Sequence, residues 1–197
     1  AFSCSTCHTV GTEPPSYAVG GGRSGRLTSG YDLYDVVYRG NWWGGYEVRL
    51  LDAINFCLVQ FMGGGALSAD GDSARALYEY LEFNSPDNPS PPLPWTTVKD
   101  VTDLRALNGD SATGRDVYNR GCKNCHGEPH SGAGKLGAKT SIIPEDTVRE
   151  FGSLARAVVV EKVRHGKFFN IGGTMAPYST EALGDQEIAD ILAYLGL

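Results

Sequence analysis

The sequence has no long hydrophobic run. Its longest uninterrupted apolar stretch covers only residues 191–195. A helix that spans a bilayer needs about 20 predominantly apolar residues. The sequence therefore predicts no transmembrane segment.

Basic residues are also few. The chain has 17 lysines and arginines against 23 aspartates and glutamates, which gives a formal net charge of -6. Nucleic-acid binding depends on a concentrated basic surface that neutralises phosphates. Because the basic residues are scattered along this sequence, we expect no nucleic-acid partner.

Cysteine and histidine are scarce, at five and four residues. Four of the cysteines nevertheless fall in two copies of the pattern C-x-x-C-H, at residues 4–8 and 122–126. This pattern is the attachment signature of c-type haem. Two thiols three positions apart on a helical turn can each form a thioether to a haem vinyl group, and the imidazole that follows then lies under the iron. We therefore predict two covalently attached haem c groups, anchored by Cys4, Cys7, Cys122 and Cys125, with His8 and His126 as proximal ligands.

A single C-x-x-C pair could instead be a redox dithiol, a disulfide or half of a zinc site, but two copies of the whole pattern favour haem. Covalent haem also indicates a compartment, because c-type attachment occurs on the outer side of the bacterial inner membrane. We expect an exported protein, periplasmic or extracellular. No charged segment followed by an apolar one precedes Ala1, so we expect the sequence to begin at a mature or trimmed end.

The C-terminal half has the clearest helical pattern. Apolar periodicity predicts helices over residues 111–121, with Ser111 as N-cap, over 147–165 and over 185–195. This order of helix, haem motif, long loop, helix, methionine-containing loop and terminal helix resembles a class I c-type cytochrome. The resemblance covers essentially all of residues 111–197 and implies that the terminal helix crosses the first helix at a glycine.

The same resemblance implies that Met175, in the loop at residues 172–177, is the distal ligand of the second haem. A soft thioether suits haem iron and raises the reduction potential. Met175 could otherwise be an ordinary core residue. Of the rival histidines, His165 is expected to be an exposed cation at a helix C-terminus, and His130 lies too close in sequence to His126 to reach the opposite haem face.

Half of the prolines crowd into residues 84–95. Such a segment is typical of a stiff, extended linker. We therefore predict an all-α fold with two cytochrome c-like haem domains joined by a proline-rich linker. The domains are expected over residues 1–84 and 111–197, with the linker over residues 85–110.

The N-terminal half departs from the class I pattern. Only three residues precede Cys4, so the helix that normally introduces the haem motif is missing. A predicted helix over residues 73–83 would then lack its usual partner. Its apolar side, with Leu77, Tyr80 and Leu81, must be covered by another element such as residues 31–39, or by another protein. The second alternative predicts a homo-oligomer or a larger complex formed through this domain.

Two sulfur side chains compete as distal ligand of the first haem. Cys57 lies on a predicted helix over residues 46–61, and Met62 follows it. If the helix continued, five residues would rotate the chain by about 500° and leave the two side chains about 140° apart, so only one could face the iron. Met62 precedes Tyr80 by 18 residues, much as Met175 precedes its own aromatic partner by 19. Cys57 could also be a small buried hydrophobe.

The run at residues 54–67 resembles the I-N-x-C…M-x-G-x-x-L segment of dihaem thiosulfate dehydrogenases, which are related to the A subunit of the sulfur-oxidation cytochromes. The resemblance covers about residues 50–81. It implies that Cys57 ligates a haem at which sulfur chemistry occurs. The second half lacks the proline-tryptophan-glycine stretch of those enzymes, which weakens the case for their activity more than the case for the Cys57 ligand. Cys57 and Met62 both remain open as ligands at this point.

These patterns predict a carrier of single electrons between redox partners outside the cytoplasm. Its negative charge favours a partner with a basic docking face. The alternative is a dehydrogenase of thiosulfate or a related sulfur anion at a His/Cys-ligated haem, for which Arg39 and Arg49 are the nearest cations in sequence, although solvated surface charge is their more typical role. A peroxidase would need an open iron position, which nothing in the sequence demands. The question of enzyme activity stays open, and the balance favours a carrier.

Overall fold

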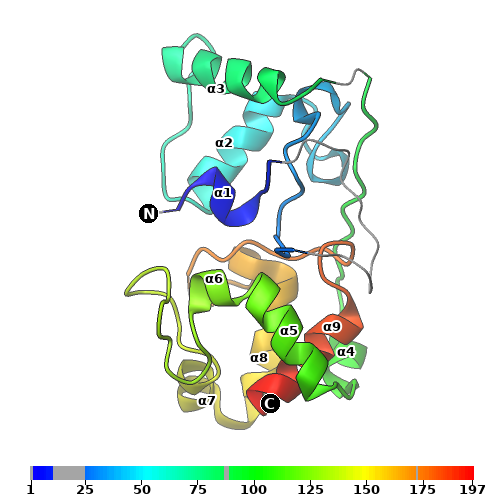
Figure 1. Ribbon diagram of the computed structural model, residues 1–197, viewed down its shortest axis with the longest axis vertical. Helices are drawn as coiled ribbons and strands as arrows, with labels where there is room; N and C mark the ends of the chain where they lie inside the picture. Colours follow the sequence, from blue (N-terminus) through cyan, green and yellow to red (C-terminus); the bar gives the residue numbers. More distant parts are fainter. Residues whose placement is uncertain (1, 11–24, 87–88, 172) are drawn as a thin grey trace. The chain divides into compact units, whose positions relative to one another are not determined.

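The computed structural model describes residues 2–10, 25–86, 89–171 and 173–197 (Figure 1). Over these residues the fold is helical, with the isolated bridge pairs Arg39–Ser90 and Trp42–Glu47 in place of a sheet. The prediction of an all-α fold is confirmed. The described helices are also too short and too polar to cross a membrane.

The chain forms two compact units, each of which contains one C-x-x-C-H motif. The N-terminal unit comprises Phe2–Ser16 and Gly30–Thr96. The C-terminal unit comprises Tyr17–Ser29 and Thr97–Leu197. The predicted linker at residues 85–110 is therefore divided between them.

The C-terminal unit is built around the crossing of its first and last long helices, α5 and α9 (Figure 1). A Cβ atom on Gly114 of α5 would lie 1.9 Å from the backbone oxygen of Asp190, so only glycine permits this approach. The predicted glycine crossing is confirmed. The Tyr118 and Tyr194 rings pack beside it, with centroids 5.7 Å apart. The helices of this unit are α4 (Thr102–Ala106), α5 (Ser111–Gly121), α6 (Lys123–His126), α7 (Glu145–Phe151), α8 (Ala155–His165) and α9 (Asp185–Leu195), with the short 3-10 turns η3 (Gly152–Leu154) and η4 (Gly166–Phe169).

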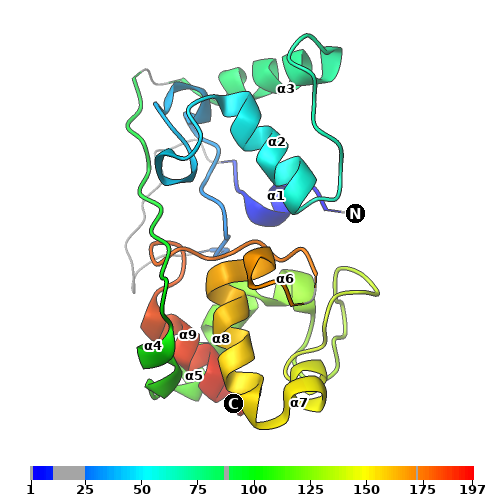
Figure 2. The same ribbon diagram turned by 180° about the vertical axis from the view of Figure 1, so that it is seen from behind.

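Two predictions for these helices need correction. The N-cap of α5 is Asp110 rather than Ser111, because the Asp110 carboxylate accepts a hydrogen bond from the Thr113 N–H at 2.7 Å. The predicted helix over residues 147–165 is two helices, α7 and α8 (Figure 2). Gly152 interrupts it with a φ of 53°, which glycine adopts without steric cost. The terminal helix begins and ends where it was predicted.

The N-terminal unit has a small core at one end of α2 (Leu50–Gln60) and α3 (Asp72–Phe83). Val36, in the short 3-10 turn η1 (Val36–Tyr38), packs there with Leu50 and Leu81. Residues 31–39 thus cover Leu77 and Leu81 of α3, which was one of the predicted alternatives. Tyr80 is not covered, since 52% of it is exposed.

The helix α2 is shorter than the predicted helix over residues 46–61. A turn that contains η2 (Trp43–Gly45) precedes it, and all three residues of this turn have positive φ angles. Such angles are incompatible with a right-handed helix. The segment before Leu50 is not helical either, because Glu47 is bridged to Trp42 and Arg49 has extended angles, with φ -121° and ψ 129°. The helix therefore begins only at Leu50, and Tyr46 is left almost fully exposed.

The proline-rich stretch packs on its own unit where the structure describes it. The Trp95 ring meets Trp43 edge-on, with ring centroids 5.0 Å apart, and Trp43 in turn contacts Phe56 and Phe61. The Tyr31 hydroxyl also donates a hydrogen bond to the Pro94 carbonyl. The stretch is therefore attached at two points rather than extended freely.

Candidate haem sites

The second C-x-x-C-H motif forms a single helical turn at the end of α5. The N–H groups of Cys125 and His126 both donate to the Cys122 carbonyl, at 3.1 and 2.9 Å. Burial raises the pKa of the Cys122 thiol to about 12, with a further contribution from Cys125. The turn thus presents two thiols and one imidazole together in apolar surroundings.

The His126 ring is held in the orientation and tautomer that iron ligation requires. Its Nδ1 atom lies 2.9 Å from the Ser141 carbonyl, which can only accept, so Nδ1 carries the proton. Burial lowers the pKa of the ring, and the bond to Ser141 opposes this only in part. The Nε2 atom of the neutral ring then offers a lone pair, as a metal-bound imidazole needs.

The first motif repeats this arrangement. The His8 N–H donates to the Cys4 carbonyl at 2.9 Å, and His8 Nδ1 lies 2.7 Å from the Tyr31 carbonyl. The carbonyl of the second cysteine also accepts a hydrogen bond in both motifs. In the first motif, the Cys7 carbonyl accepts from Gly30 N–H at 2.9 Å. In the second unit, Leu136 N–H donates to the Cys125 carbonyl at the same distance. The two motifs therefore share one hydrogen-bond pattern, although different segments supply the partners.

The segment at residues 30–33 supports the first motif. The Leu33 N–H donates to the Thr9 carbonyl at 2.9 Å, which extends the contact beyond His8. A Cβ atom on Gly30 would lie only 2.3 Å from the His8 ring. Sequence reasoning missed Gly30, Tyr31 and Ser141, because two of them act through backbone carbonyls and the third through the lack of a side chain.

The loop that carries Met175 is held at several points. The Met175 carbonyl accepts from Lys167 N–H at 2.8 Å, and a Cβ on Gly166 would lie 2.5 Å from the same oxygen. The Lys162 ammonium donates to the Ile171 and Gly173 carbonyls at 2.6 and 3.2 Å.

Two further contacts place the side chain and the loop. Met175 itself is partly buried against the core of the C-terminal unit. The Tyr178 hydroxyl donates to the Gly121 carbonyl at 2.9 Å, which ties the loop to the end of α5, next to Cys122.

The rival histidines have other partners. His165 was predicted to be an exposed cation, but only 24% of its side chain is exposed. Its ring lies between the Glu161 carboxylate, at 2.8 Å, and the Val98 carbonyl, at 2.6 Å, because residues 97–107 pack against α8. His130 contacts the Glu145 carboxylate at 2.5 Å.

Cys57 and Met62 lie in different local structures. Cys57 is part of α2, and the pKa of its thiol is raised to about 12, first by burial and then by the nearby charges of Cys7 and Cys4. The thiol is therefore within electrostatic range of both cysteines of the first motif, which forms α1 (Cys4–Cys7). Met62 follows the end of α2, where its N–H donates to the Cys57 carbonyl at 3.2 Å.

The two arginines considered for anion binding are held within the N-terminal unit. Arg39 is buried rather than solvated, since only 6% of it is exposed, and it donates to the carbonyls of Asp32 and Tyr34. Arg49 is exposed and pairs with Asp52, with Nε 2.7 Å from Oδ2.

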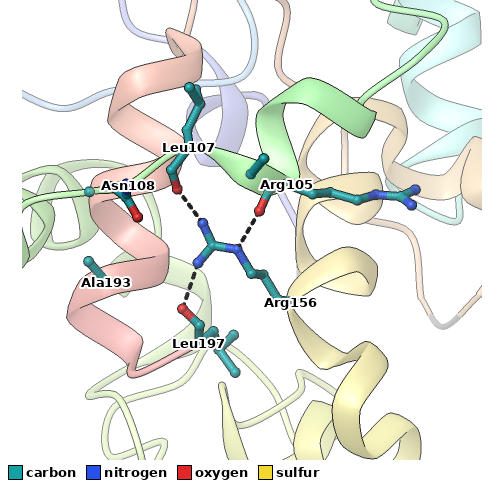
Figure 3. A pocket seen from close by; sticks show the side chains of 8 residues that line it. Arg105, Leu107, Asn108, Arg156, Ala193 and Leu197 are labelled. Atoms are coloured by element: carbon teal, nitrogen blue, oxygen red, sulfur yellow. Dashed lines mark hydrogen bonds between the residues drawn. The ribbon is translucent and has the colours of Figure 1, made fainter.

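A surface pocket of the C-terminal unit lies away from these sites (Figure 3). Its centre is the Arg156 guanidinium, which donates to the carbonyls of Arg105, Leu107 and Leu197 at 2.7, 2.5 and 2.6 Å. These bonds engage all three guanidinium nitrogens. Arg156 therefore joins α4 to the segment that follows α9 rather than binding a ligand.

The residues of the C-terminal unit fit a covalently bound haem. The cysteine pair lies on one turn, the neutral imidazole is oriented by a carbonyl, and a fixed methionine loop precedes the terminal helix. These features are similar to those of a c-type cytochrome domain. The sequence profile of the family described as Cytochrome C oxidase, cbb3-type, subunit III matches residues 109–195. No curated protein matches the chain. The family match supports a covalent haem c, electron transfer and redox partners, and such domains are typically extracytoplasmic.

Proposed function

We propose that the protein is a dihaem c-type cytochrome that transfers single electrons between redox partners outside the cytoplasm. The family match covers only the second motif. The observation that supports a second haem is the hydrogen-bond pattern shared by the two motifs. The proposed anchors are Cys4, Cys7, Cys122 and Cys125, with His8 and His126 as proximal ligands.

When bound, each haem supplies the one-electron redox couple, and the chain determines its ligation and surroundings. The carbonyls of Tyr31 and Ser141 hold the two proximal rings in the tautomer that exposes Nε2 towards the iron. The loop that carries Met175 is held by Lys167, Lys162 and Tyr178. These contacts favour Met175 as distal ligand of the second haem.

For the first haem we propose Cys57 as distal ligand rather than Met62. The electrostatic influence of Cys7 and Cys4 on the Cys57 thiol supports a position near the attachment turn.

Intact-mass measurement of the exported protein tests the number of haems. We expect two haem additions, and one addition in a variant with both Cys4→Ala and Cys7→Ala. The matched variant with Cys57→Ala should keep both, since Cys57 forms no thioether. One addition in the unaltered protein would contradict the dihaem proposal.

Low-temperature EPR of the oxidised protein tests the first distal ligand. We expect a thiolate-type low-spin signal that disappears in Cys57→Ala and persists in Met62→Ala. The opposite result would assign Met62.

Steady-state assays with thiosulfate and ferricyanide separate the carrier from the sulfur-anion dehydrogenase. The engagement of Arg39 and Arg49 with groups of their own unit favours the carrier. We expect no turnover of thiosulfate, and turnover that depends on Cys57 would establish the enzyme.

A further inference from the structure

Charge is divided unequally between the two units. Among the described residues, the N-terminal unit has eight aspartates and glutamates and three arginines, and the C-terminal unit has thirteen acidic and thirteen basic residues. All six lysines of the chain belong to the C-terminal unit. The overall charge of -6 therefore conceals one acidic unit and one nearly neutral unit.

The acidic surface of the N-terminal unit includes the outer face of α3. Glu79 and Glu82 are exposed there, beside Tyr80 and Phe83, which are 52% and 86% exposed. The arginines of this unit are committed locally: Arg39 to backbone carbonyls, Arg49 to Asp52 and Arg75 to Asp72. The acidic α3 face, defined as Glu79, Tyr80, Glu82 and Phe83, thus combines negative charge with exposed aromatic area.

The lysines of the C-terminal unit gather around its haem motif and methionine loop. Lys139 is exposed, two residues before the Ser141 carbonyl that holds His126, and Lys167 N–H binds the Met175 carbonyl. Five of the six lysines follow this distribution, and we call them the lysine rim: Lys123, Lys135, Lys139, Lys162 and Lys167. Within the rim, Lys123 pairs with Glu128, and the ammonium groups of Lys135 and Lys162 donate to backbone carbonyls of their own unit.

Apolar side chains are exposed within the same segments. Leu136, Phe168 and Ile171 are 37%, 55% and 38% exposed. Leu136 N–H donates to the Cys125 carbonyl, and the Ile171 carbonyl accepts from Lys162, so Leu136 lies next to the haem motif and Ile171 belongs to the methionine loop. The segments of the lysine rim therefore expose apolar side chains beside charge, as the acidic α3 face does, with charge of the opposite sign.

We propose that the acidic α3 face of one copy docks on the lysine rim of a second copy. Opposite charge would steer the two surfaces together, and the aromatic and aliphatic side chains would supply the apolar centre that such an interface needs. The contact is head-to-tail, so each dimer leaves one surface of each kind available and the copies can continue into an open chain. This interface would place a neighbouring copy beside the second haem, so the proposal rests on the proposed function.

Sedimentation velocity of the holoprotein tests this interface. We expect concentration-dependent association at about 0.01 M salt that weakens at about 0.15 M, where the screening length is only ~8 Å. Reversal of the acidic α3 face by Glu79→Lys with Glu82→Lys should lower the association constant by at least about tenfold. Reversal of the lysine rim by Lys139→Glu with Lys167→Glu should do the same. The control, Arg115→Glu, reverses one exposed charge of α5 outside the rim and should associate like the unaltered protein.

Mixing the two reversed variants gives the decisive result. Each variant alone has lost one surface, but the intact lysine rim of one complements the intact α3 face of the other, so the mixture should associate again. Protein that stays monomeric at low salt, equal loss in the control, or failure of the mixture to associate would overturn the proposal. If a reversed variant folds poorly, Glu79→Gln with Glu82→Gln provides a milder removal of charge. Haem content, measured on the same samples, reports separately on the proposed function.

Discussion

Gly30 is the residue on which the orientation of the first proximal ring depends. Its backbone lies against His8, with no room for a Cβ atom. Gly30→Ala should push the ring away from the Tyr31 carbonyl and destabilise the N-terminal unit by about 1–3 kcal/mol, the usual cost of overpacking. EPR and redox titration should show a change at the first haem and none at the second. Gly65→Ala is the matched control, because nothing lies within 4 Å of the Cβ that it would add. Equal effects of the two substitutions would contradict this role.

Asp146 links the acid stability of the protein to the loop that holds the second proximal ring. Its carboxylate accepts from Ile142 N–H at 2.7 Å, next to Ser141. This bond, followed by the contact with Arg149, lowers the pKa of Asp146 from its ordinary value of 3.8. The folded state therefore binds this proton less readily than the unfolded state, so the stabilisation is present above about pH 3.8 and is lost as the pH falls through the lower folded pKa.

Thermal unfolding between neutral and acidic pH, followed by haem absorbance, checks this expectation. Asp146→Asn keeps an oxygen that can accept from Ile142 but removes the titration. Its melting temperature should fall less steeply than that of the unaltered protein below about pH 4. Parallel curves would show that Asp146 does not contribute.

At the scale of elements, the crossing of α5 and α9 is the contact that least tolerates change. A methyl group at Gly114 would meet the backbone of Asp190, which cannot rotate away as a flexible side chain can. We expect Gly114→Ala to lower the free energy of unfolding by about 3 kcal/mol. Denaturant unfolding measures this, and Gly121→Ala should cost much less, since its added Cβ would have an ordinary contact of 3.5 Å with Leu27. A comparable loss of the free energy of unfolding in both variants would show that the close approach at Gly114 is not what limits this crossing.

The elements also show what a sequence can predict and what it cannot. The bounds of α9 were predictable from local apolar spacing, and the glycine crossing was predictable from the resemblance to class I cytochromes. The break at Gly152 and the late start of α2 were not, because the positive φ angle at Gly152 and the bridge between Trp42 and Glu47 leave the apolar spacing unchanged. The carbonyls that orient His8 and His126 were beyond prediction for another reason, since every residue carries a carbonyl and only the fold selects Tyr31 and Ser141.

At the scale of the whole molecule, the proposed ligands make the two haems unequal. A methionine ligand raises the reduction potential of haem iron, and a thiolate donates electron density to it. We therefore expect two resolved one-electron transitions, with the N-terminal haem the lower, so that electrons pass from the N-terminal to the C-terminal haem. Spectroelectrochemical titration should resolve both transitions. Cys57→Met should raise the lower one towards the other, and a single unshifted transition would contradict the asymmetry.

The aromatic cluster around Trp43 has a practical consequence. All three tryptophans of the chain, Trp42, Trp43 and Trp95, belong to the N-terminal unit. Intrinsic tryptophan fluorescence, which a nearby haem quenches by energy transfer, is therefore an optical reporter of one half of the protein. Its recovery during unfolding would follow the loss of the N-terminal unit alone, while haem absorbance follows both halves.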